Sequence, residues 1–197
     1  MDSALFHPAI ERALRVAFEA HEGQTRKGDP IPYVSHPVHV ALLLARAGAD
    51  EVTLQAAILH DVVEDCDGWD EERIASLFGE EVRATVAHVT EVQGLPWEER
   101  KQAVVERVGR MDLRAAMVKA ADQTHNMRSM AEKLDAASTG EDFWRPFSRG
   151  PAATIDMAER LVDALAARLR ELDGPAVLVE DLRAAFAALR VHHPSRG

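Results

Sequence analysis

Apolar residues recur at helical spacing along almost the whole chain, and glycines and prolines separate the segments in which they do so. In the first segment, Ile10, Leu14, Ala17 and Phe18 follow the i, i+4, i+7, i+8 pattern of one helix face. The same spacing indicates helices at about 37–47, 50–65, 71–78, 80–91, 111–131, 152–172 and 177–190, with a further one beginning near 96. No segment alternates cleanly with the period of two that half-buried strands show. The pattern predicts one all-α domain over residues 1–197, a bundle of about nine helices, with loops at 23–35 and 135–150.

Composition and charge narrow the classes of protein that fit this pattern. Apolar residues make up 47% of the 197 residues and charged residues 28%, as in a soluble globular domain. The net charge of −10 excludes a basic footprint for nucleic acid over the whole fold. No apolar run is long enough to span a membrane, and the N-terminus lacks a signal-peptide pattern. With a single cysteine, Cys66, we expect a cytoplasmic protein without nucleic-acid or membrane partners, and the sequence does not indicate its oligomeric state.

The common signatures of several enzyme classes are absent from the chain. It contains neither the phosphate-binding loop G-x-x-x-x-G-K-[ST] nor the dinucleotide fingerprint G-x-G-x-x-G. It also lacks a G-x-S-x-G elbow and a C-x-x-C pair. Nucleophilic serine chemistry, zinc fingers and nicotinamide redox chemistry therefore lose most of their support.

A histidine and three acids gather at the end of the segment predicted to be helical over 50–65. His60 and Asp61 are adjacent, and Glu64 and Asp65 follow one turn later, so all four are expected on overlapping faces of one helix. An isolated His-Asp pair is most often a solvated helix end. Here the surrounding residues are apolar, and ionisable groups beside buried surface need a partner such as a divalent cation. The second acidic pair could hold and deprotonate a water molecule.

Two further residues are candidates to complete a metal site with His60 and Asp61. His36 stands at the start of the predicted helix 37–47, and Asp122 is expected on the inward face of the helix 111–131. Each is weak evidence alone, because a histidine before proline is often a helix-start residue and a helical aspartate is usually exposed. Together the four give two imidazoles and two carboxylates, a mixed set that leaves coordination positions open and suits Mn²⁺, Fe²⁺ or Zn²⁺.

In this order, His36, His60-Asp61 and Asp122 resemble the H…HD…D signature of the HD-domain phosphohydrolases. The neighbouring stretches narrow the resemblance to the hydrolase domain of RelA/SpoT-type enzymes, which remove the 3′-pyrophosphate of (p)ppGpp. They are RKGDPIPYVSHPVHVA, LQAAILHDVVED, FGEEVRATVAHVTEV, ERKQ and VKAADQTHNMRSM. The resemblance covers roughly residues 8–132, and the helices at 150–190 lie beyond it. The length leaves no room for a synthetase or regulatory domain. The resemblance therefore implies a stand-alone small alarmone hydrolase with an HD-domain fold.

Residue by residue, the resemblance implies a Mn²⁺-dependent site, with other divalent transition metals possible. It makes His36, His60, Asp61 and Asp122 the metal ligands, and Glu64 and Asp65 the pair that positions and activates the attacking water. The implied contacts to a guanine nucleotide are Arg26, Lys27, Tyr33, Lys101 and Asn126. The implied reaction converts (p)ppGpp to GDP or GTP and pyrophosphate.

One departure from the family pattern leaves alternative functions open. The family usually reads Lys-Leu-Ala-Asp-Arg/Lys-Leu around the last ligand, whereas this chain has Gln123 and Thr124 after Asp122. The lost base could reshape the nucleotide pocket, so an HD-domain phosphatase acting on a nucleoside monophosphate or NADPH is the alternative. A third possibility is a helical module that binds a nucleotide or partner without catalysis. The Glu64-Asp65 pair argues against it, because a binder does not need a pair that activates water.

Several other residues are expected to be structural. His21 is expected at the surface, and Trp144 is expected to pack against other side chains. Cys66 stands among acids, which disfavour the thiolate, so we do not expect a reactive nucleophile.

Overall fold

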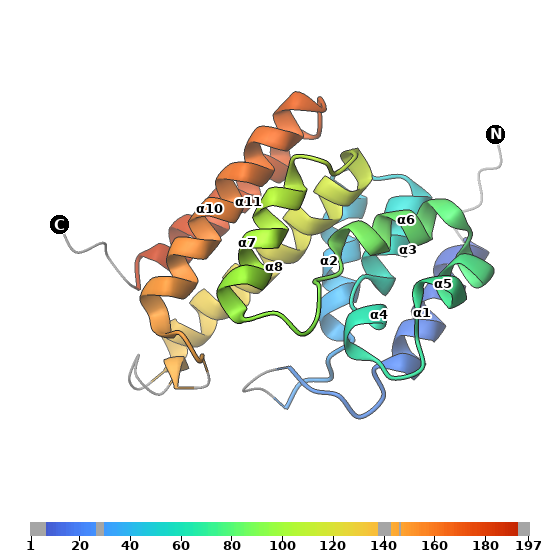
Figure 1. Cartoon of the computed structure of the whole chain (residues 1–197), viewed down its shortest axis with the longest axis horizontal. Helices are drawn as coiled ribbons and strands as arrows, with labels where there is room; N and C mark the ends of the chain where they lie inside the picture. Colours follow the sequence, from blue (N-terminus) through green and yellow to red (C-terminus); the bar gives the residue numbers. More distant parts are fainter. Residues whose placement is uncertain (1–6, 27–29, 138–142, 146, 193–197) are drawn as a thin grey trace. The chain divides into compact units, whose positions relative to one another are not determined.

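The structure is a computed structural model that describes residues 7–26, 30–137, 143–145 and 147–192 (Figure 1). Within these ranges it contains ten helices and one isolated β-bridge, between Thr25 and Pro32. The helices are α1 (Pro8–Ala20), α2 (Ser35–Arg46), α3 (Glu51–Leu59), α4 (Val62–Asp65), α5 (Glu71–Phe78), α6 (Glu80–Val89), α7 (Trp97–Val108), α8 (Leu113–Ala136), α10 (Gly150–Glu171) and α11 (Ala176–Arg190). The predicted all-α class is confirmed. None of these helices combines the length and apolar character needed to cross a bilayer.

The chain divides into two compact units, Met1–Gln93 and Gly94–Gly197, which are described separately. The single domain over residues 1–197 stays a prediction. In the first unit, α3 packs against α1, α2 and α6. Its residues Ala56, Ala57, Ile58 and Leu59 are all buried, because the sequence TLQAAIL offers no polar face to solvent. The end of α3, where His60 and Asp61 follow, therefore lies in apolar surroundings.

In the second unit, the long helix α8 packs against α11 and α10, and α10 packs against α7. Alanines at 115, 116, 120 and 121 are fully buried on α8. Large side chains from α10 and α11, including Leu165, Leu169, Leu182 and Leu189, complete this core. Small side chains on one helix and large ones on its neighbours fill the space between helices without voids. The buried stretch of α8 leads directly to Asp122.

Aspartates at three helix starts explain why these helices begin where they do. Asp50, Asp70 and Asp112 each accept a hydrogen bond from the backbone N–H three residues later, at α3, α5 and α8. Such N-caps satisfy a donor that the helix itself leaves unpaired and contribute about 1 kcal/mol each. At Asp70 the amide of Arg73 donates to Oδ1 at 2.8 Å.

The predicted single helix over 50–65 is wrong in one respect, because it breaks at the His-Asp pair. α3 ends at Leu59 and α4 begins at Val62, so His60 and Asp61 form the turn between two helices. The ring Nδ1 of His60 donates to the carbonyl of Ala57 at 2.8 Å. In a continuing α-helix that carbonyl would accept from the amide of Asp61. A side-chain hydrogen bond thus competes with the main-chain ladder at this point.

Candidate active site

The loop before α2 and the first turn of α2 position His36. The loop 23–35 contains the isolated bridge, in which the Arg26 amide donates to Ile31 and the Tyr33 amide donates to Gln24. The His36 amide then donates to the carbonyl of Tyr33 at 2.9 Å, one residue before Pro37. α2 begins at Ser35, two residues earlier than the expected start at Pro37. His36 is 1% exposed.

His60 presents a defined nitrogen to the carboxylate beside it. Because a carbonyl can only accept, the 2.8 Å contact with Ala57 places a proton on Nδ1 of His60. Its Nε2 then lies 3.2 Å from Oδ2 of Asp61, and Nε2 of His36 lies 3.5 Å from the same oxygen. The rings of His36 and His60 are 5.1 Å apart at 61°. Nε2 of His60 and Oδ2 of Asp61 are both atoms that can ligate a divalent cation, and a cation beside them would engage both.

Tyr33 contacts the same carboxylate. Its hydroxyl donates to Oδ2 of Asp61 at 2.7 Å, and its ring lies 4.8 Å from that of His21. The guanidinium of Arg26 lies over the Tyr33 ring, 5.5 Å from its centre. Arg26 therefore brings a positive charge to the side of the site on which Tyr33 lies. Lys27, the third residue expected to contact a nucleotide here, lies outside the described residues.

The two acids of α4 have different environments. Oε2 of Glu64 accepts a hydrogen bond from the backbone amide of Glu91 at 2.9 Å, which ties α4 to the segment that follows α6. Asp65 keeps part of its surface in solvent. Partial burial raises the pKa of Asp65, and the neighbouring charge of Asp61 raises it further, while a hydrogen bond from Tyr33 works in the opposite direction. One carboxylate is thus held in place and the other is more easily protonated than an ordinary aspartate.

In the second unit, Asp122 is buried on α8 and surrounded by donors. It is 4% exposed, and its Oδ2 accepts from Nζ of Lys119 at 3.0 Å and from the side-chain amide of Gln123 at 3.2 Å. Its Oδ1 accepts from the side-chain amide of Asn126 at 2.6 Å. Asn126, expected to face a nucleotide, therefore contacts the predicted metal ligand. Lys101 lies half-buried on α7.

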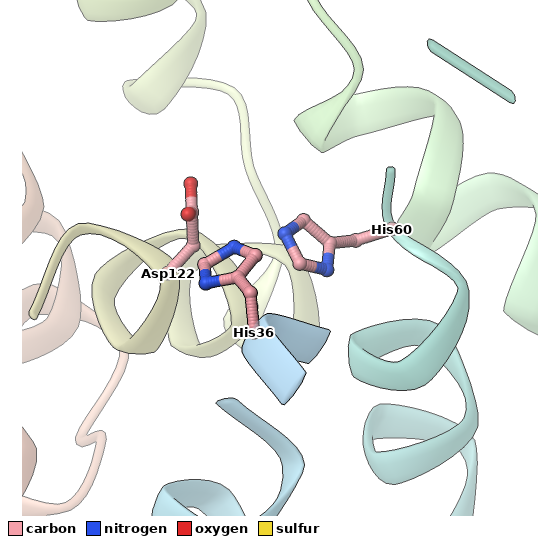
Figure 2. A group of neighbouring side chains, drawn as sticks. All are labelled: His36, His60 and Asp122. Carbon is pink, nitrogen blue, oxygen red and sulfur yellow. The ribbon is translucent and has the colours of Figure 1, made fainter. Parts of the chain in front are cut away.

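Two of the four predicted ligands, His36 and His60, lie together in the first unit, and a third, Asp122, belongs to the second unit. Figure 2 shows these three side chains. The fourth predicted ligand, Asp61, contacts the two histidines through Oδ2. Imidazole nitrogens and carboxylate oxygens are the ligands that divalent transition metals accept. This arrangement supports binding of a divalent metal.

Sequence reasoning missed the buried cluster next to Tyr33. His21, expected at the surface, is 3% exposed. Its Nδ1 donates to the side-chain oxygen of Gln24 at 2.8 Å and lies 3.3 Å from the sulfur of Cys66. The three-residue spacing of His21 and Gln24, just after the last apolar residues of α1, was the available signal. Trp144 lies buried against Phe143 and Phe147, as expected of a packing residue.

The Cys66 thiol is expected to react slowly with alkylating reagents. Burial raises its pKa to about 11, and the charges of the neighbouring aspartates add to that effect. At pH 8 the thiolate fraction of Cys66 is then about a hundredfold smaller than that of an ordinary cysteine. Because only the thiolate is nucleophilic, the labelling rate should fall by a similar factor. Iodoacetamide labelling followed by mass spectrometry measures the rate, with the urea-unfolded chain as control. Equal rates for the folded and unfolded chains would contradict this expectation.

Comparison with known proteins identifies the class to which this fold and site belong. The HD domain model matches residues 13–150, and the chain is a member of the HD domain family. It is 43% identical over 128 residues to a guanosine-3′,5′-bis(diphosphate) 3′-pyrophosphohydrolase of Vibrio cholerae, a match covering 62% of this chain and 18% of that protein. It is 42% identical over 125 residues to the Xenopus tropicalis protein of the same description, MESH1, covering 61% of this chain and 69% of that one.

Among solved structures, the fold matches a protein described as a metazoan ortholog of SpoT that hydrolyzes ppGpp and plays a role in starvation responses. The TM-score is 0.77 at 30% identity, covering 94% of this chain and 97% of the other. By contrast, the chain spans less than a fifth of the length of the first bacterial relatives, 18% in each of the Vibrio cholerae and Escherichia coli proteins. The HD-domain fold expected from the sequence resemblance is confirmed.

Proposed function

We propose that this chain is a metal-dependent hydrolase that removes the 3′-pyrophosphate of (p)ppGpp, releasing GDP or GTP and pyrophosphate. The observation that carries the proposal is the placement of two buried imidazoles around one carboxylate, with Nε2 of His36 and of His60 at 3.5 and 3.2 Å from Asp61. The relatives named above supply the substrate, a small guanine nucleotide. We further propose a cytoplasmic location, without nucleic-acid or membrane partners.

The residues present fit a divalent cation, which we propose to be Mn²⁺ held by His36, His60, Asp61 and Asp122. The bond from Nδ1 of His60 to the Ala57 carbonyl is the outer contact that metal-binding histidines commonly make, because it fixes the tautomer that leaves Nε2 as the ligand. Lys119 and Asn126 hold the two oxygens of Asp122 in one orientation. When bound, such a cation stabilises negative charge on phosphoryl oxygens.

We assign different roles to the two acids of α4. One oxygen of Glu64 is engaged by the Glu91 amide, so Glu64 orients a water molecule with the oxygen that remains. Asp65 is part-exposed on the same turn, and it takes the proton from that water as the water attacks the phosphorus bound to the 3′ oxygen. The bond from that phosphorus to the 3′ oxygen breaks, the pyrophosphate group departs, and the 3′ oxygen takes up a proton from solvent to become the 3′ hydroxyl of GDP or GTP.

Basic and polar side chains bind the rest of the nucleotide in this account. Arg26 offers positive charge beside Tyr33. We assign Lys27 the same binding role, and we assign Lys101 to the second diphosphate. The protein's net charge of −10 repels an anionic nucleotide at long range, so local charges must provide the attraction. Tyr33 and Asn126 reach the site through the carboxylates that they contact, Asp61 and Asp122.

The test is product identification with purified protein loaded with Mn²⁺. We expect ppGpp to give equal amounts of GDP and pyrophosphate, separated by ion-exchange chromatography, and a chelator to stop the reaction. Parallel incubations contain a nucleoside monophosphate or NADPH. Release of orthophosphate from either of these, with no pyrophosphate from ppGpp, would contradict the proposal and favour a phosphatase on the same fold.

A further inference from the structure

Gln24 joins two segments of the first unit that carry proposed site residues. Its side-chain amide donates to the backbone carbonyl of Asp65 at 2.9 Å, across 41 residues of sequence. Its side-chain oxygen accepts from Nδ1 of His21 at 2.8 Å, and His21 is itself buried. Its backbone carbonyl accepts from the amide of Tyr33 at 2.9 Å. One residue thus contacts the end of α1, the loop before α2 and the end of α4.

The contact with Asp65 satisfies a group that α4 cannot satisfy itself. α4 has four residues, and its last carbonyls have no amide one turn later in the helix to accept from. At this end of α4, the side-chain amide of Gln24 donates to the carbonyl of Asp65. Because so short a helix has little stability of its own, contacts from outside it fix the direction in which Glu64 and Asp65 point.

The contact with Tyr33 determines where its hydroxyl lies. The Gln24 carbonyl holds the Tyr33 backbone, His21 packs beside the ring at 4.8 Å, and the hydroxyl then meets Asp61 at 2.7 Å. The same glutamine therefore holds the main chains of Tyr33 and Asp65. A shift of either segment would move the tyrosine hydroxyl relative to the acids.

We propose that Gln24 is a positioning residue that holds the Asp65 turn and the Tyr33 loop in the relative arrangement that hydrolysis requires. The catalytic part of this inference rests on the proposed function, whereas the positioning part concerns the molecule alone. Misplacing a reacting group by about 1 Å can cost on the order of a hundredfold in rate, so a residue that touches no substrate can still control kcat.

Two variants and one matched control test the inference. Gln24→Leu keeps most of the side-chain volume and removes the side-chain hydrogen bonds to His21, Asp65 and Cys66. Gln24→Glu keeps the oxygen that faces His21 but removes the donor to Asp65 and Cys66. In both variants the backbone carbonyl of residue 24 still accepts from the Tyr33 amide. Gln55→Leu is the control, because Gln55 lies in the same unit and its amide also donates to a backbone carbonyl, that of Glu51 at 3.2 Å. Tyr33 is the only tyrosine in the chain, so ring-¹³C tyrosine gives NMR signals from this one residue.

We expect both Gln24 variants to shift or broaden the Tyr33 ring signals and to lower kcat for ppGpp at least about tenfold with KM within about twofold. The Gln55→Leu variant should leave the ring signals and kcat as in the wild type, even where its melting temperature falls equally. Unchanged ring signals and kcat in both Gln24 variants, or equal changes in the Gln55 control, would overturn the inference. A wild type that releases no pyrophosphate refutes the proposed function instead, and the ring signals then decide the positioning role by themselves.

Discussion

The double variant His60→Ala/Asp61→Ala is expected to lose bound Mn²⁺ and, with it, turnover of ppGpp. The substitutions remove two adjacent ligands, one of them 2% exposed, and neither alanine offers a lone pair. Changes in the residues that merely contact metal ligands cost about 10- to 100-fold in affinity, so removal of two ligands should cost more than that. Metal content after equilibrium dialysis, measured by elemental analysis, gives the number of ions per chain.

A second His-Asp contact in the same chain provides the control for this variant. Nε2 of His192 lies 3.3 Å from Oδ1 of Asp135, nearly the same separation as between His60 and Asp61. This pair is not part of the proposed site, so His192→Ala/Asp135→Ala should bind Mn²⁺ as the wild type does. Circular dichroism verifies that both variants remain helical. A His60/Asp61 variant that keeps as much Mn²⁺ as the control would show that the ligand assignment is wrong.

The second large effect is expected from Asp65→Asn, which should retain Mn²⁺ and lose most turnover. Removal of a general base typically lowers the rate by about 10²–10⁴-fold. The amide is nearly isosteric with the carboxylate, so substrate affinity should change little and the loss should appear in kcat. Asp67→Asn, a change in an exposed acid two residues away, is the matched control and should leave kcat unchanged. Loss of Mn²⁺ from Asp65→Asn would instead place Asp65 among the metal ligands.

The same substitution should stabilise the metal-free protein. The pKa of Asp65 is raised on folding, so the fold favours its protonated form. The resulting cost to stability is absent below the unfolded pKa and fully present once the pH exceeds the raised pKa. A neutral amide removes this cost, and the melting temperature of Asp65→Asn at pH 7 should exceed that of the wild type, with the difference shrinking as the pH falls toward 4. A lower melting temperature at pH 7 would contradict the sign of the shift.

The helical class was predictable because it depends on periodicity alone. The apolar spacing in α1 and α3 and the cap at Asp70 are local properties, and the structure has each of them. The apolar surroundings of His60 and the inward placement of Asp122 were also predicted, and both residues are buried. The break between α3 and α4 was not, because it involves the hydrogen bond from one ring nitrogen of His60 to Ala57, and residue spacing does not specify side-chain partners.

The least predictable features are contacts between segments distant in sequence. Nothing in the residue spacing indicates that the Tyr33 hydroxyl donates to Asp61, or that the Glu64 carboxylate accepts from the amide of Glu91. The burial of His21 likewise depends on Gln24 and Cys66, the second of which is 45 residues away. Most of the proposed positioning roles are based on these contacts, so those roles could be proposed only from the structure.

The central claim is that water attacks the phosphorus bound to the 3′ oxygen, and hydrolysis in H₂¹⁸O tests it most directly. Mn²⁺-loaded protein is incubated with ppGpp in labelled water, and the products are separated and weighed by mass spectrometry. We expect one ¹⁸O atom in the pyrophosphate and none in the GDP, because the bond that breaks joins phosphorus to the 3′ oxygen. Label in the GDP, or label in orthophosphate with no pyrophosphate formed, would contradict the account.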